Sequence, residues 1–173
     1  PFYQSFVLEV ADNWVGGSVY NLPLNEFTTE MENAVMSGYS IAWASDVSEK
    51  GFSFKNGLAI VPEDDKALSM SGKDNKHFSD AGAERSGNQF DTPGKEKTIT
   101  QDMRQTAFDN YSTTDDHGMH ITGLVTDQLG AKYYIVKNSW GTKNDCDGYM
   151  YASIPYVQYK TMDIMVHKDA LSK

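Results

Sequence analysis

The sequence predicts an α+β fold, in which helices pack outside a twisted antiparallel sheet or half-open barrel. Strand-like segments occupy roughly the last 60 residues, whereas the clearest helical periodicity lies near the start of the chain. Of the 173 residues, 39% are hydrophobic and 12% are aromatic. This composition is sufficient to bury the core of one domain or of one large lobe.

One short strand is predicted on each side of the first helix. Phe6, Leu8 and Val10 alternate with polar or small neighbours, which favours a strand, and Gly16-Gly17 would interrupt it. Residues 39–45, with the sequence YSIAWAS, are typical of a short and mostly buried strand. These two segments therefore flank the helix that is described next.

The helix between these strands has the clearest start and stop signals in the chain. Pro23 stands near its start, Asn25 is a candidate N-cap, and Gly38 occupies the usual position after a helix end. Apolar residues spaced at i, i+4, i+7 and i+8 form one stripe, which consists of Phe27, Met31, Ala34 and Val35.

The second half of the chain contains a polar segment, a helix and four strands. Residues 63–97 are rich in Asp, Lys, Ser, Gly and Asn without a sustained period, so we predict a polar surface insertion. A helix is expected over 99–110, and Met103, Ala107 and Phe108 should face the core. The predicted strands are His117–Thr126, Lys132–Asn138, Gly148–Ile154 and Thr161–His167, with a turn at 128–130 and a polar loop at 141–148.

The charge and the cysteine content limit the classes of partner. The formal net charge of −9 and the pI of about 4.8 disfavour binding to nucleic acid or to anionic lipid. The chain has a single cysteine, Cys146, which excludes an internal disulfide. No apolar run reaches the ~18 residues that a membrane span requires, and nothing in the composition calls for a cofactor.

His117 and Asn138 are the candidate catalytic residues. His117 begins one predicted strand and Asn138 ends the next, so an antiparallel pairing would bring the two residues side by side. A histidine that acts as a general base needs a partner that orients its second ring nitrogen. An asparagine carbonyl orients the ring without adding a charge, which suits a pair of thiolate and imidazolium. Trp140 is placed to shield their hydrogen bond from water.

The motifs around this pair resemble the papain superfamily of cysteine peptidases. Asn138-Ser139-Trp140-Gly141 followed by Gly148-Tyr149 is similar to the segment around the asparagine of that superfamily. Within it, three upstream motifs look like the bleomycin hydrolase/aminopeptidase C branch. They are Val19-Tyr20-Asn21, Gly38-Tyr39-Ser40-Ile41-Ala42-Trp43 and Asp46-Val47, and the resemblance covers about residues 1–61 and 107–170.

This resemblance implies that the chain is the histidine- and asparagine-bearing lobe, residues 1–173, of a thiol peptidase. His117 would act as base and acid, Asn138 would orient it, and Trp140 would shield the pair. The nucleophilic cysteine and the oxyanion-hole glutamine of such enzymes lie upstream of any position in this chain. We therefore expect the chain alone to be inactive and to need the cysteine-bearing lobe of the same protein.

The resemblance also carries expectations about specificity and assembly. Peptides would be the substrates, relatives are usually cytoplasmic, and many form homo-hexamers. The known relatives continue beyond the position of Lys173 as an arm whose carboxylate pairs with the substrate amino group. Because the chain ends at Lys173, exopeptidase specificity is less firmly implied than cysteine peptidase chemistry.

The chain begins at Pro1, so an upstream targeting segment would not be visible.

Three alternatives stay open at the level of sequence. A catalytically inactive interaction module could retain Trp140 and the glycines, but it would not need both His117 and Asn138. A metal site would require ligands that converge, whereas His117 and His120 should lie on opposite faces of one strand. The third alternative is that Cys146 is the nucleophile. It follows the histidine in sequence and is flanked by acidic residues that raise a thiol pKa, so we expect it to be structural.

Overall fold

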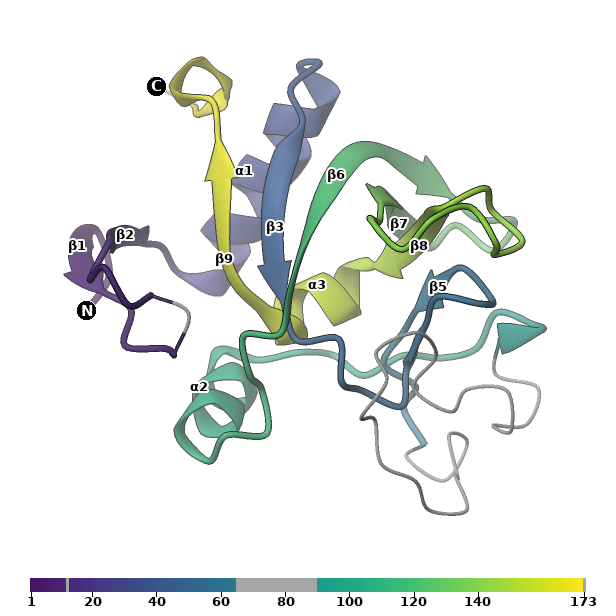
Figure 1. Ribbon diagram of the computed structural model, residues 1–173, viewed down its shortest axis with the longest axis horizontal. Coiled ribbons are helices and arrows are strands. Elements are labelled where there is room, and N and C mark those ends of the chain that lie inside the picture. Colours follow the sequence, from purple (N-terminus) through teal and green to yellow (C-terminus); the bar gives the residue numbers. More distant parts are fainter. Residues whose placement is uncertain (12, 65–89, 173) are drawn as a thin grey trace.

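A seven-stranded sheet dominates the computed structural model, which describes residues 1–11, 13–64 and 90–172 (Figure 1). The strand order is β4-β5-β8-β7-β6-β3-β9, and every neighbouring pair is antiparallel except β5 and β8. The strands are β3 (Ile41–Ser45), β4 (Phe52–Ser53), β5 (Leu58–Ala59), β6 (His117–Thr126), β7 (Lys132–Lys137), β8 (Tyr149–Ser153) and β9 (Thr161–Val166).

The four strands predicted in the second half of the chain are all confirmed. The bounds of β6 agree with the prediction, and β7, β8 and β9 each start or end within one residue of it. The short strands β4 and β5 and the helix α3 (Ile154–Lys160) were not predicted. Most of the predicted insertion, residues 65–89, lies outside the described residues, so its character stays a prediction.

Within the described residues, three α-helices and the 3-10 turn η4 pack around the sheet. The helix α1 (Leu24–Met36) contacts β3 and β6, whereas α3 contacts β7, β8 and β9, and α2 (Gln101–Asp109) packs on α3. The 3-10 turn η4 (Lys168–Ala170) contacts α1 near the end of the chain. This arrangement confirms the predicted α+β class with helices outside an antiparallel-rich sheet.

The start of α1 corrects the prediction that Asn25 is its cap. Pro23 is the N-cap and no side chain of α1 caps the helix. Instead, Gln101 of α2 accepts a hydrogen bond from the backbone N–H of Leu24 at 3.0 Å, which satisfies a donor that the helix leaves free. A long-range partner has therefore replaced the local cap that the sequence suggested.

The end of α1 agrees with the prediction. Gly38 has φ of +85°, and the N–H groups of Gly38 and Tyr39 donate to the carbonyls of Val35 and Ala34. These two bonds form the Schellman motif that usually closes a helix before a glycine. Met31 and Ala34 of the predicted stripe are fully buried, while Phe27 and Val35 are partly buried against the core.

The predicted N-terminal strand is shorter than expected. It runs over β1 (Gln4–Val7) and pairs with β2 (Ser18–Asn21) in a separate two-stranded sheet. Phe6 lies in this strand, but Leu8 and Val10 follow it. In Figure 1 the hairpin stands apart from the main sheet, so its alternation of apolar residues does not continue the pattern of the core strands.

The core lies where alternate residues of the central strands point to the same side. Trp43 and Ile41 of β3, Ile121 of β6 and Val136 of β7 are each at most 1% exposed. The ladder between β6 and β7 shifts register between Ile121 and Gly123, which is the mark of a β-bulge. The strong curvature of β6 in Figure 1 fits this irregularity.

Among the glycines of the loop between β7 and β8, Gly148 is expected to be the least tolerant of substitution. It has φ of +84°, and an added Cβ would lie 2.5 Å from the carbonyl oxygen of Gly141. Gly130 has a similar φ of +90° but open space around it, so it is a matched control.

We predict that Gly130→Ala lowers the free energy of unfolding by about 1–2 kcal/mol, the usual cost of a left-handed conformation. Gly148→Ala should lower it by about 1–3 kcal/mol more, because a backbone clash is added. Urea denaturation measures both values. Equal losses would contradict the packing described for the loop.

Candidate active site

His117 and Asn138 lie side by side at the end of the sheet, as their predicted strands require. The Nε2 atom of His117 is 2.8 Å from the Oδ1 atom of Asn138. His117 begins β6 and pairs with Ser45 of β3, while Asn138 directly follows β7 and donates its backbone N–H to Gly148. Asn138 is buried and His117 is half-buried.

The hydrogen bonds around Asn138 determine the role of each ring nitrogen of His117. The backbone N–H of Ser139 donates to the same Oδ1 atom at 2.7 Å, so this atom must be the carbonyl oxygen of the amide. Nε2 of His117 must therefore donate a proton to it. In the neutral ring, Nδ1 then carries the lone pair, and no described residue hydrogen-bonds to it.

Trp140 covers the pair from one side. Its ring centroid lies 4.7 Å from that of His117, and the two planes are inclined by 31°. Phe52 and Phe54 meet the indole edge-on at 5.8 Å and 5.4 Å, and both are buried. These aromatic contacts restrict the position of the indole beside the histidine. The structure places Trp140 against the ring of His117, and its shielding role stays a prediction. The contacts of the two phenylalanines were not recognised from the sequence.

A buried ammonium group stabilises the segments that lead into this site. Lys160 is 4% exposed and its Nζ lies 3.5 Å from Oδ2 of Asp46, which is 1% exposed. The ammonium also contacts the carboxylate of Glu49, and it donates to the Ser112 carbonyl at 2.7 Å and to Oγ1 of Thr113 at 3.0 Å. The network therefore joins the end of α3 to the loop after β3 and to the segment before β6.

Asp46 and Asp116 complete the network next to His117. Asp46 accepts hydrogen bonds from the backbone of Ser48 and Thr114, and Asp116 accepts from the backbone of Ser48 as well. Burial, together with the hydrogen bond to Asp116 and the charge of Glu49, raises the pKa of Asp46 to about 7. Although burial opposes it, hydrogen bonds from Asp46, Ser48 and Thr114 hold the pKa of Asp116 below its ordinary value. The sequence singled out Asp46 only as part of the Asp46-Val47 motif.

Cys146 has the environment of a structural thiol. It is half-buried and packs so closely on Gly57 that a Cβ there would lie 2.5 Å from its Sγ. Burial raises the pKa of the thiol, and the charges of Asp145 and Asp147 raise it further. A thiol with a raised pKa is a poor nucleophile at neutral pH, which agrees with the structural role predicted for it.

The remaining candidates do not form a second site. His120 is exposed on the face of β6 opposite to the buried Met119 and Ile121, as strand alternation requires. Among the described residues, no group of three or more His, Cys, Asp or Glu side chains could hold a metal ion. Within the same residues, no helix is long and apolar enough to cross a membrane.

Comparison with known proteins connects this geometry to a family. Residues 95–166, which include His117, Asn138 and Trp140, match the model of the papain family of cysteine proteases. The structure of PepW from Lactobacillus rhamnosis HN001 (DR20) superposes with a TM-score of 0.65 and 21% identity over 99% of the chain. The chain thus has the papain-like fold that the sequence predicted, and it spans 33% of the length of PepW.

Other matched structures align less closely. The bromelain protease of Ananas comosus, solved with the inhibitor E64, gives a TM-score of 0.40 and 16% identity. That alignment covers 80% of this chain and 45% of bromelain. The SERA5 proenzyme of Plasmodium falciparum gives a TM-score of 0.33 and 17% identity, over 83% of this chain and 28% of that one. No curated protein sequence matches the chain.

Loss of the Lys160 ammonium should destabilise the protein far more than loss of a surface ammonium. Lys160→Ala would leave Asp46 and Glu49 without their cation, and breaking a buried pair costs about 3–5 kcal/mol. Lys132 pairs with Glu32 at 2.6 Å on the surface, so Lys132→Ala should cost at most about 1 kcal/mol. Urea denaturation at pH 8 measures both losses. Similar values would refute the structural role of the network.

Proposed function

We propose that this chain, which has a papain-like fold and matches the papain family of cysteine proteases over residues 95–166, supplies the base of a cysteine-type peptidase. The single observation that carries the proposal is the hydrogen bond between Nε2 of His117 and Oδ1 of Asn138 at 2.8 Å. This bond leaves Nδ1 as the basic nitrogen, on a half-buried ring under an indole.

The nucleophile would be a cysteine in an upstream lobe of the same protein. Nδ1 of His117 would take the thiol proton, and the thiolate would attack the carbonyl carbon of a peptide bond. The imidazolium would then donate this proton to the departing amine, which leaves an acyl-enzyme. In the second half of the reaction, Nδ1 would take a proton from water as the water attacks the acyl group, and then return it to the cysteine sulfur as the acid leaves.

Asn138 would act as the positioning residue for the histidine. Its carbonyl accepts the Nε2 proton in both the neutral and the charged ring, so the ring keeps its orientation when Nδ1 gains and loses a proton. The amide adds no charge of its own, which leaves the thiolate as the counter-ion of the imidazolium. Burial of Asn138 and the cover of Trp140 strengthen this hydrogen bond.

We further propose an aminopeptidase of the bleomycin hydrolase type. The motifs Gly38–Trp43 and Asp46-Val47 support this branch, and the structure gives Trp43 and Asp46 buried, hydrogen-bonded positions. The indole N–H of Trp43 donates to Oγ1 of Thr161 at 2.7 Å. A homo-hexamer and a C-terminal arm that binds the substrate amino group would follow from the same resemblance.

Replacement of His117 in the full-length protein should abolish peptidase activity. Loss of a general acid–base typically lowers the rate by about 10²–10⁴-fold, so we expect kcat/KM of His117→Ala to fall at least that far. His120→Ala is the matched control, because His120 is exposed on the other face of the same strand, and its kcat/KM should stay within twofold. Aminoacyl and peptidyl aminomethylcoumarins are suitable substrates.

Two results would contradict the proposal. Substantial activity of His117→Ala would remove the histidine from the mechanism. A full-length protein that shows no turnover, although it is folded, would favour the inactive interaction module. Substrates with free and with blocked α-amino groups distinguish the finer proposal, because an aminopeptidase cleaves only the free ones.

A further inference from the structure

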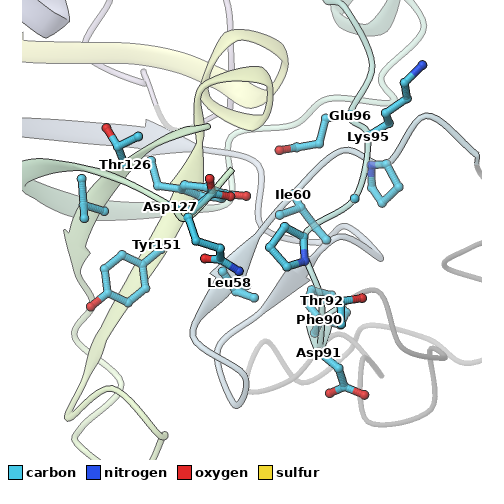
Figure 2. Close-up of a pocket in the computed structure, with 16 residues that line it drawn as sticks. Leu58, Ile60, Phe90, Asp91, Thr92, Lys95, Glu96, Thr126, Asp127 and Tyr151 are labelled. Atoms are coloured by element: carbon cyan, nitrogen blue, oxygen red, sulfur yellow. The ribbon is translucent and has the colours of Figure 1, made fainter. Parts of the chain in front are cut away.

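A cavity of about 310 Å³ lies at the far end of β6 from His117. β6 ends at Thr126, roughly 30 Å along the strand from the histidine at about 3.3 Å per residue. The walls are mostly apolar and come from separate segments (Figure 2), namely Leu58 of β5, Ile60, Phe90, Val125 of β6 and Tyr151 of β8. The volume is at the lower end of the range for small-molecule sites, about 300–1,000 Å³.

Glu96 supplies a carboxylate to this apolar cavity. Its Oε2 atom accepts hydrogen bonds at 2.6 Å from the backbone N–H of Val61 and at 2.6 Å from Oγ of Ser153. Its other oxygen, Oε1, has no hydrogen-bond partner among the described residues. Burial raises the pKa of Glu96, although both hydrogen bonds act to lower it. The carboxylate is therefore firmly positioned, and no cation of the described part of the chain pairs with it.

Asp127 supplies a second carboxylate. Its Oδ1 atom accepts hydrogen bonds from the backbone of Leu129 at 2.8 Å and of Ala131 at 2.9 Å. Its Oδ2 atom is buried and has no partner in the described part of the chain. Burial, together with the charges of Glu96 and Asp127, raises the pKa of Tyr133 to about 12. Glu96, Asp127 and Tyr133 all line the same cavity.

Lys95, the one cation among the described residues that line the cavity, does not neutralise these carboxylates. Lys95 pairs with Glu63 at 3.9 Å, and its side chain is 88% exposed. In Figure 2 its ammonium group points away from the cavity, and the carboxylate of Asp91 also points outward. The interior therefore combines an apolar wall with negative charge that no described side chain offsets.

We propose that this cavity binds a small organic cation, in which a protonated amine or guanidinium is attached to an aromatic or aliphatic body. The apolar wall would take the body of the ligand, and Glu96 and Asp127 would take its charge. An anion would be repelled by the same carboxylates. The two carboxylates fall short of the three or more ligands that a metal ion usually takes.

2-Phenylethylamine is a suitable probe, because it is a protonated amine on an aromatic body at pH 7.4. We expect it to bind the protein with a measurable Kd in calorimetry and to shift the NMR signals of Tyr133 and Tyr151. 2-Phenylethanol has nearly the same shape without the charge and should bind at least tenfold more weakly. 3-Phenylpropionate carries the opposite charge and should not bind.

The variant Asp127→Asn tests whether a carboxylate of the cavity binds the charge of the amine. Asp127→Asn retains the oxygen that holds the turn, so it should fold normally and weaken amine binding about tenfold without affecting 2-phenylethanol. Asp91→Asn is the matched control, because it removes one charge that points outward, and it should leave the Kd unchanged. Thermal unfolding verifies that each variant is folded. Absence of amine binding, equal binding of the alcohol, or an unchanged Kd in Asp127→Asn would overturn the proposal.

Discussion

The buried ammonium of Lys160 is the constraint on which the geometry of the candidate site depends. A charge that is 4% exposed must be compensated, and Asp46, Glu49, Ser112 and Thr113 together provide this compensation. These partners come from the loop after β3 and from the segment before β6. Because one cation binds both, neither segment can shift without leaving a charge or a carbonyl unpaired in the interior.

The same residue also aligns the strand that begins with His117. The carbonyl of Lys160 accepts hydrogen bonds from the backbone of Asp46 and from Oγ of Ser45, each at 3.0 Å. Ser45 in turn pairs with His117 in the ladder between β3 and β6. On the other side, Asn144 fixes the loop beside Asn138, since its side chain bonds to the backbone of Phe54, Tyr149 and Gly148. Buried polar side chains therefore position both members of the pair.

Much of the site could be predicted because it depends on strand order and local motifs. A tight turn between β6 and β7 is sufficient to place His117 beside Asn138, and alternation along β6 places His120 on the opposite face. The face of the sheet to which each side chain points is thus determined by the local sequence. The fold class followed from the same strands and from the clear stop signal of α1 at Gly38.

Most of the features that the sequence did not reveal depend on contacts between distant residues. Gln101 replaces Asn25 as the partner of the first turn of α1, over a separation of 77 residues. Lys160 looks like an ordinary surface lysine in the sequence, and only the approach of Asp46 from 114 residues away makes it a core residue. Helix α3 has only seven residues and follows β8 without a loop, so no periodicity could separate it from the strand.

The central claim is that His117 activates a thiol that this chain does not contain. It is tested most directly by the rate of alkylation of the full-length protein with iodoacetamide at pH 6, with the labelled cysteine identified by mass spectrometry. A thiol with an ordinary pKa of about 8.5 reacts slowly at this pH, whereas a thiolate paired with imidazolium reacts readily. The account predicts rapid labelling of an upstream cysteine, at least a tenfold loss of this rate in His117→Ala, and no labelling of Cys146. Labelling confined to Cys146, or a rate that does not depend on His117, would contradict it.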